Sequence, residues 1–410
     1  MEKLETSTFK VYKYRWVVLI AYMLIVAMNQ LLWITFAPIT SDAVKFYQVT
    51  DLQIGLLSMC FMIVFILLSI PASWIIDTYG IRIGVGIGAV LTGVFGLLRG
   101  MVPHDFTLLL LAQIGIAAGQ PFLLNAITKI AARWFPFEER ATASGLGSLA
   151  MYLGILIGMI LTPLLTASHG IIGMLSIYGI SAIIAAVLFL LVVKERPLTA
   201  PCLPGQEERS LALDGLKDTL RNKGFNWLML IFFIGLGVFN SVATWIEDIL
   251  RPRGFSATQA GLTGGLMILG GILGAIIMPM LSDYYKKRIP FIIIALIGAT
   301  AGLTGISFAS TYWMLLTSGF ILGFFLLSAG PIGFQYGAEI TYPASEGTSN
   351  GLLLMVGQVS GIAFIVAMDM FKSPLTGSMT SPLVVLIGLM VLSILLSSKL
   401  RESVMMSGKK

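Results

Sequence analysis

Long apolar runs, separated by short polar segments, make up most of the chain. A helix that crosses a bilayer needs about 20 mainly apolar residues, and runs of this length recur along the whole sequence. The runs are continuous and lack the alternation of apolar and polar positions that marks membrane β-strands, so they predict α-helices. Twelve spans are predicted, at residues 15–37, 52–76, 81–101, 106–134, 141–166, 171–194, 225–250, 257–281, 289–309, 313–338, 347–371 and 380–400.

The composition agrees with this pattern. The 410 residues are 57% hydrophobic and 11% charged, whereas soluble proteins carry about 25% charged residues. This excludes a soluble enzyme, a nucleic-acid-binding protein and a disordered chain. Two cysteines, Cys60 and Cys202, are too few for a disulfide-stabilised secreted scaffold. We therefore expect an all-α membrane protein that is embedded in the lipid bilayer and has no nucleic-acid partner.

The basic residues predict an orientation. An even number of spans puts both termini on one side, and the segments on that side hold 21 of the 26 Lys and Arg residues. Because positive loops remain in the cytoplasm, we expect a multi-pass protein of the cell membrane with both termini cytoplasmic. The first span has no small-residue cleavage site and is expected to be retained. The outer loops are predicted to hold the other five basic residues, Lys45, Arg99, Arg251, Arg253 and Lys372.

A polar segment and an internal repeat divide the chain. Residues 195–224 are polar, contain three prolines and separate six spans from six, which predicts bundles at 1–194 and 225–410 joined by a cytoplasmic linker. The two halves repeat four positions at an offset of 206 or 207 residues, as expected for duplicated six-helix units. These pairs are Asp77 and Asp283, Pro136 and Pro343, Glu139 and Glu346, and Gly145 and Gly351.

The turn after the second span of each half resembles that of the major facilitator superfamily. The first copy runs from Ser73 to Arg82 and keeps the Asp77, the glycine and one arginine of the superfamily pattern, while the second keeps Asp283 and basic residues from Lys286 onward. The resemblance implies twelve helices in two bundles that transport by alternating access. The turn carboxylates are expected to lie near helix N-termini and stabilise an inner-closed state. Ordinary loop charges that cap helices are the alternative.

Polar side chains inside apolar spans identify candidate substrate contacts, because each is costly unless it has a partner or faces water. At mid-depth, the Trp33 ring suits stacking or a cation–π contact, although it could also serve only for packing. Gln120 precedes Pro121, which removes a helix hydrogen bond and is expected to break the helix beside this amide, as in a cavity wall. A neighbouring helix could equally satisfy the amide. The candidates are Asn29, Gln30, Trp33, Gln120, Asn240 and Gln358.

Residues 31–39, 120–135 and, most sharply, 339–353 resemble the feline leukaemia virus subgroup C receptor-related family of facilitators. Its members are associated with choline and related amines, and haem has also been proposed. The resemblance implies that Trp33 faces the amine and that Gln120 and Gln358 line the pocket. At Asn240 this chain departs from the family, which has a cage tyrosine there. We therefore expect a smaller or more polar amine, or a neutral polar solute.

Two histidines, His104 and His169, fall in predicted outer loops, and Cys60 is the one mid-membrane candidate for an iron ligand, so haem is disfavoured as a substrate. No cofactor or metal site is expected. No titratable group lies clearly at the midplane, which favours facilitated diffusion. Lys129 stands where the resembling family has an arginine, and it either pairs with a carboxylate of an inner gate or extends to the interface. The peripheral carboxylates are Glu339 and Glu346 on the inner side, and Glu247, Asp248 and Asp369 on the outer side.

The predicted function is that of a monomeric transporter of a small organic solute, such as an amine or an organic cation like choline. The glycine-rich stretches lack the lysine and serine that end a nucleotide-binding loop, and no catalytic constellation is present, so an enzyme is not expected. Two alternatives remain open. One is a proton-coupled exporter of drugs or metabolites on the same fold, and the other is a non-transporting membrane sensor or receptor.

Overall fold

The computed structural model describes residues 11–102, 104–136, 139–197, 199, 216–342 and 346–402, except the side chains of Ala141 and Glu346. Within these ranges the regular secondary structure is helical. The long helices are α1 (Tyr14–Ile34), α3 (Asp51–Tyr79), α4 (Ile81–Met101), α5 (Phe106–Leu124), α7 (Arg140–Val192), α9 (Lys223–Thr244), α11 (Ala257–Tyr284), α12 (Ile289–Phe308), α13 (Tyr312–Thr341), α14 (Glu346–Met370) and α15 (Thr380–Ser397). The short ones are η1 (Ala37–Ile39), α2 (Thr40–Tyr47), α6 (Ile127–Trp134), α8 (Leu216–Arg221), α10 (Ile246–Leu250) and η3 (Arg251–Arg253).

Eleven helices of the described chain are long and apolar enough to cross a membrane. One of them, α7, is interrupted at Gly170, whose φ of 68° and ψ of 175° are not helical. A straight helix of its 53 residues would be about 80 Å long, far more than the roughly 30 Å hydrocarbon core. It therefore holds two spans that reverse direction at Gly170, which gives the twelve predicted helices.

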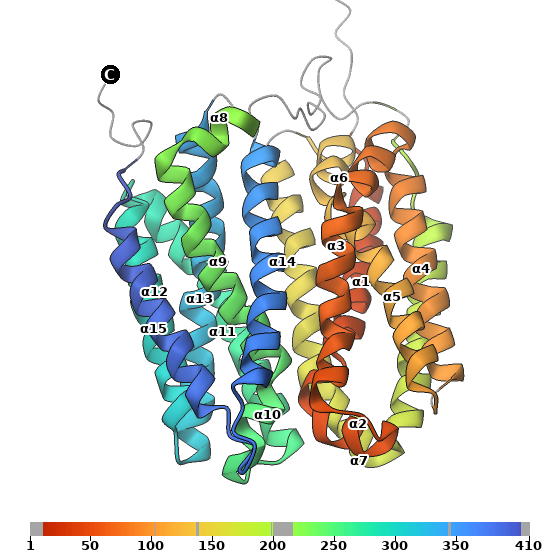
Figure 1. Ribbon diagram of the computed structural model, residues 1–410. Helices are drawn as coiled ribbons and strands as arrows, with labels where there is room; N and C mark the ends of the chain where they lie inside the picture. Colours follow the sequence, from red (N-terminus) through yellow and green to blue (C-terminus); the bar gives the residue numbers. More distant parts are fainter. Residues whose placement is uncertain are drawn as a thin grey trace, which may run out of the picture.

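The helices form two groups that stand side by side (Figure 1). The helices up to Val192 lie on one side and those from Lys223 onward lie on the other; we call them the first and second halves. Tyr14 at the start of α1 donates a hydrogen bond of 2.7 Å to the carbonyl of Val192 at the end of α7. We call this end of the molecule, which also carries α6 and α8, the terminal end, and the opposite end, with α2 and α10, the distal end.

The internal repeat is visible in how the helices begin. Thr50 and Gln53 form a capping box at the start of α3, with their reciprocal bonds at 3.3 and 2.9 Å, and Ser256 and Gln259 do the same for α11. These boxes satisfy two of the free N–H groups that every helix N-terminus has. The residues correspond at an offset of 206, so duplicated positions keep the same local chemistry.

A second repeated contact closes each half at the terminal end. The Glu195 carboxylate follows α7 and accepts hydrogen bonds from the backbone N–H groups of Ile81 and Arg82 at the start of α4. The Glu402 carboxylate follows α15 and accepts bonds from the N–H groups of Arg288 and Ile289 at the start of α12. A carboxylate is favourable at a helix N-terminus because of the helix dipole.

Three local predictions need correction. Helix α5 continues through Pro121, and the break in the predicted fourth span comes at Asn125, whose amide donates to the Ser69 and Ser73 hydroxyls at 3.0 Å. The predicted seventh span ends at Thr244, where Trp245 turns the chain into α10. Arg99 does not lie in an outer loop: it is fully buried in the last turn of α4.

Candidate functional site

A cavity of about 190 Å³ lies between the two halves. It reaches toward the terminal end, where Leu228 in the second turn of α9 and Ile292 in the first turn of α12 form part of its wall. Most of the wall is apolar. The polar part consists of Gln30, Trp33, Gln120, Tyr152, Asn240 and Gln358, and no Asp, Glu, Lys or Arg is found among the lining residues that the structure describes.

Five of the six residues proposed from the sequence line this cavity, and they come from both halves. Asn29 does not. Its side-chain amide is fully buried and donates to the Thr92 hydroxyl at 3.0 Å and to the carbonyl of Ile116 at 3.2 Å, so it joins α1 to its neighbours α4 and α5. The amide of Gln30 is 3.4 Å from Asn29 Oδ1. Asn29 therefore orients a cavity residue from behind.

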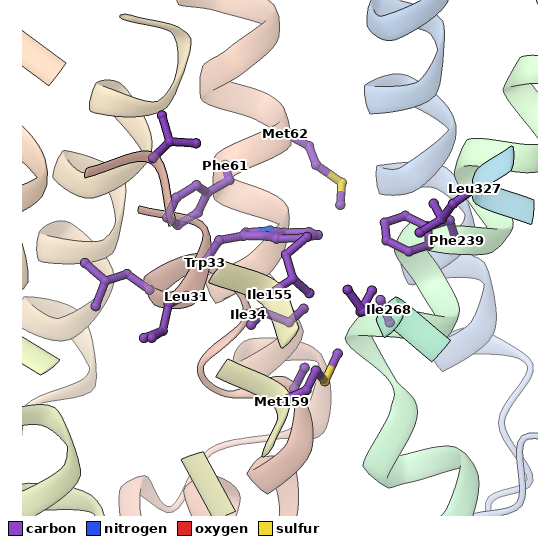
Figure 2. Packing of buried hydrophobic residues seen from close by; sticks show 14 of the residues in the cluster. Leu31, Trp33, Ile34, Phe61, Met62, Ile155, Met159, Phe239, Ile268 and Leu327 are labelled. Atoms are coloured by element: carbon purple, nitrogen blue, oxygen red, sulfur yellow. The ribbon is translucent and has the colours of Figure 1, made fainter. Parts of the chain in front are cut away.

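The indole of Trp33 is fixed at the cavity wall. Its Nε1 donates to the carbonyl of Ser58 on α3 at 3.2 Å, and the side chain is 6% exposed. Figure 2 shows Trp33 close to Phe61 and Met62, with Phe239 of the second half on the opposite side. The cavity thus has aromatic rings on both sides. Phe239 was not predicted, because an aromatic residue inside an apolar run carries no signal of its own.

Asn240, next to Phe239 on α9, faces the cavity beside α14. Among the described residues, its Nδ2 has only a long contact of 3.5 Å, with the carbonyl of Gly357. A neutral amide with weak protein partners retains donors and an acceptor for a solute. The cavity therefore combines ring faces with uncharged hydrogen-bonding groups.

Ionic contacts close the distal end across the two halves. Asp51 at the start of α3 pairs with Lys372 after α14 at 2.5 Å and with Arg251 of η3 at 3.8 Å. Glu247 of α10 accepts bonds from the backbone N and the hydroxyl of Ser41, at 2.9 and 2.7 Å. These contacts connect the first half to the second at the distal end, opposite the terminal end toward which the cavity extends.

Asp248 lies among these charges and is fully buried. Arg251 at 2.7 Å and Lys372 at 3.3 Å contact its Oδ1, whereas its Oδ2 has no hydrogen-bond partner in the described structure. Burial raises the pKa of Asp248 to about 7, with Asp51 and Glu247 adding to the increase and the two cations opposing it. Burial also raises the pKa of Glu247.

Close apolar packing seals the same end. A Cβ atom on Gly55 of α3 would lie 2.8 Å from the ring of Trp245, which is fully buried and donates its Nε1 to the carbonyl of Ile365. On the other side of the interface, Gly261 and Gly264 of α11 face Met159 of α7 in the same way. The missing side chains permit the two halves to approach each other closely.

Comparison with known proteins identifies the fold. Residues 18–365 match the family model of the Major Facilitator Superfamily. The chain belongs to this superfamily. A crystal structure of a bacterial homologue of the human lysosomal transporter Spinster, inward-facing and unoccupied, superimposes with a TM-score of 0.72 at 17% identity and covers 95% of this chain and 96% of that one. The predicted twelve-helix membrane fold is confirmed.

Several relatives of the superfamily align over most of the chain. "Solute carrier family 49 member A3" of Xenopus tropicalis is 31% identical over 91% of this chain and 81% of its own length. "Choline/ethanolamine transporter flvcr2a" of Danio rerio is 29% identical over 89% and 82%, and FLVCR2 of Homo sapiens is 28% identical over 88% and 73%. The predicted membership of the feline leukaemia virus subgroup C receptor-related family is confirmed. The chain is a membrane transporter with a small-molecule substrate.

The charged residues that the sequence proposes for this transporter's gate lie at the terminal end. Lys129 pairs with Asp77 at 3.0 Å and donates to the carbonyl of Ile76 at 2.6 Å, all within the first half. The side chain of Arg82 is exposed, and its backbone N–H donates a hydrogen bond to the Glu195 carboxylate.

In the second half, Asp283 pairs with the buried Arg288 and not with Lys286, which has a φ of 51° and turns the chain. Arg288 also pairs with Glu339 at 3.0 Å, and hydrogen bonds to Asp283 and Glu339 raise the pKa of Arg288 although burial lowers it. Glu346 has no described side chain. These pairs each hold one half together, while the distal contacts join the two halves.

Proposed function

We propose that this transporter moves a small organic amine or organic cation across the cell membrane by facilitated diffusion, as a monomer with both termini in the cytoplasm. One observation carries the proposal: the cavity between the halves is uncharged and combines two rings on its opposite sides, Trp33 and Phe239, with the amides of Gln120, Asn240 and Gln358. No metal or cofactor is needed for this chemistry.

An ammonium group suits these walls. Over the face of an aromatic ring, it gains about 0.5–2 kcal/mol, and amide oxygens can accept its N–H groups. The relatives named as choline/ethanolamine transporters support an amine. At Asn240 an amide takes the place of a ring, which favours an amine with N–H and hydroxyl groups, such as ethanolamine, over a fully methylated one.

Alternating access requires the two ends of the molecule to open in turn. The distal end is closed by Asp51 with Lys372 and by Gly55 with Trp245, while the cavity extends toward the terminal end. With the termini in the cytoplasm, this is an inward-facing state. Transport requires the two halves to separate distally and to meet at the terminal end, where the turns that begin at Asp77 and Asp283 would come together.

Proton-coupled export is the second candidate, and Asp248 is the observation that favours it. This carboxylate is buried in the distal closure, with one oxygen unpaired and a pKa raised to about 7. If protonation drives transport, an imposed pH gradient will accumulate substrate in proteoliposomes and Asp248→Asn will abolish the accumulation. Facilitated diffusion instead predicts equilibration without accumulation in both proteins. Neutralisation of Glu339 or Asp369 extends the same test to the other proposed carboxylates.

The direct test is uptake and binding of labelled ethanolamine and choline by purified protein in proteoliposomes. We expect Trp33→Ala to weaken amine binding by about 2- to 30-fold, the equivalent of 0.5–2 kcal/mol, and Trp33→Phe to retain most of the affinity. Trp313→Ala is the matched control, because Trp313 is 78% exposed and away from the cavity. Equal losses in the two Trp33 variants, or no binding of any amine, would contradict the proposal.

A further inference from the structure

A guanidinium group is buried behind the cavity without a carboxylate partner among the described residues. Arg99 is fully buried, and its Nη atoms donate to the carbonyl of Leu32 at 3.1 Å, to Gln113 Oε1 at 2.9 Å and to the Thr35 hydroxyl at 3.3 Å. Its carbon Cζ also lies 5.6 Å from the centroid of the Phe36 ring. Because burying a charge costs free energy unless partners compensate it, the groups around Arg99 must offset this cost.

Helix α1 supplies part of the compensation. It ends at Ile34, so the carbonyls of its last turn lack helical partners and carry the negative end of the helix dipole. Arg99 lies at this end and donates to one of those carbonyls, that of Leu32. The cation therefore holds the last turn of α1, which is also the turn that carries Trp33.

Gln113 of α5 extends the same contact to a second helix. Its Nε2 donates to the carbonyl of Leu32 at 3.2 Å and to the carbonyl of Leu57 on α3 at 3.2 Å. Its Oε1 accepts from Arg99, which fixes the direction of the amide, because the oxygen must face the guanidinium and the nitrogen must face the carbonyls. One fully buried amide thus joins α1 to α3.

Gln113 binds the carbonyls of Leu32 and Leu57. Each of these residues is next in sequence to a residue that takes part in the Trp33 contact. Leu32 precedes Trp33 in α1, and Leu57 precedes Ser58, whose carbonyl accepts from the indole Nε1 at 3.2 Å. The backbone of Trp33 and the acceptor of its N–H group are therefore both next to residues tied to Gln113.

We infer that Arg99 and Gln113 are positioning residues that hold the indole of Trp33 in its place at the cavity wall. The inference rests on the proposed role of Trp33 in binding an amine. Neither side chain lines the cavity. They act through Leu32 and Leu57, the neighbours of Trp33 and of its acceptor Ser58, and they keep the orientation of the ring constant while the two halves move.

Gln113→Glu separates positioning from simple electrostatics. The variant retains an oxygen for Arg99 and gains an ion pair, so the guanidinium keeps its contact with residue 113, but it loses the donor to Leu32 and Leu57. A new negative charge would by itself tighten the binding of a cation. Loss of position predicts the opposite. With ethanolamine as the probe, we expect the Kd to rise about tenfold, the size of effect seen between coupled residues.

A double-mutant cycle tests the route through Trp33. We expect Gln113→Glu to change the Kd by less than about twofold once Trp33 is Ala, because the ring it positions is gone. Arg99→Lys, which loses the forked donation, should behave in the same way and serves as the second variant if Gln113→Glu does not fold. Arg253→Met is the matched control, since Arg253 also donates to main-chain carbonyls near the distal end, but in the second half.

A second readout does not depend on any ligand. The indole ¹⁵N–¹H resonance of Trp33, assigned by its loss in Trp33→Phe, should shift in Gln113→Glu and Arg99→Lys and remain unchanged in Arg253→Met. An unmoved resonance, or additive effects in the cycle, overturns the inference. If the resonance shifts but the wild type binds neither ethanolamine nor choline, the positioning role stands and the proposed amine function fails.

Discussion

Lys372 Nζ lies 2.5 Å from Asp51 Oδ2, which ties the segment after α14 to the start of α3. The two residues are 321 positions apart and belong to different halves of the transporter. The lysine is 12% exposed and also contacts the fully buried Asp248. This one ammonium group therefore contacts two carboxylates where the halves meet, and its removal should loosen the distal end more than the loss of an exposed charge.

Lys372→Ala should shift the transporter toward a state that is open at the distal end. Removal of one partner from a buried ion pair costs about 3–5 kcal/mol, and Arg251 offsets part of this cost. Ile155→Cys places a thiol in the cavity, in a background without Cys60 and Cys202. We expect a membrane-impermeant thiol reagent, added from the distal side, to label it about tenfold faster. Lys45→Ala, which removes an exposed distal lysine, should leave the rate unchanged.

Gly55→Leu should prevent the distal end from closing. The Cβ alone would lie 2.8 Å from the Trp245 ring, and a leucine side chain cannot fit there. We expect faster distal labelling of Ile155→Cys and loss of transport, since the cycle needs both states. Trp245→Ala removes the ring and should restore transport to Gly55→Leu. If the double variant remains as inactive as the single one, the steric explanation is wrong.

Much of the fold could be predicted because a membrane imposes strong local rules. Continuous apolar runs predict spans, basic residues predict the side, and polar groups within spans, such as Gln120 and Gln358, are rare enough to indicate a cavity. The repeat was likewise visible in Asp77 and Asp283. Each of these signals resides within a single segment of the sequence.

Contacts between distant segments could not be predicted. Arg99 follows an apolar run and precedes a loop, so it resembles a residue at the interface, and its burial depends on Gln113 and on the end of α1. The break in the fourth span was assigned to Pro121, yet helices in a membrane can accommodate proline. Asn125, held by serines of α3, ends the helix instead.

Acidification should favour the distal-closed state. In that state burial raises the pKa of Asp248 to about 7, with Asp51, Glu247, Arg251 and Lys372 around it, whereas a solvated aspartate titrates near 3.9. Below pH 7 the closed state binds a proton that the open state does not, so stability of the closed state rises as pH falls through 7. The thiolate fraction itself falls with pH, so the rate is divided by that of a free thiol at the same pH. The normalised distal labelling of a cavity thiol should therefore be slower at pH 6 than at pH 8.

Asp248→Asn removes the titrating group and should make this normalised labelling rate nearly independent of pH over the same range. Asp42→Asn is the control, because Asp42 is an exposed carboxylate at the same end. A faster normalised rate at pH 6, or an unchanged normalised pH profile in Asp248→Asn, would contradict the assignment to this carboxylate.

Asn240→Tyr should change the amine preference of the transporter. Asn240 lines the cavity next to Phe239, and its amide has only a 3.5 Å contact with the carbonyl of Gly357, so replacing it costs few protein contacts. A ring here would add a second face opposite Trp33. We expect choline to bind about 2- to 30-fold tighter, the equivalent of one cation–π contact of 0.5–2 kcal/mol. Ethanolamine should bind no tighter, because its ammonium group loses an amide acceptor.

Asn240→Leu, which has neither ring nor amide, is the control and should weaken the binding of both amines. Competition binding of the two amines on the same preparation measures the ratio, and an unchanged ratio in Asn240→Tyr would show that the substrate does not contact this position.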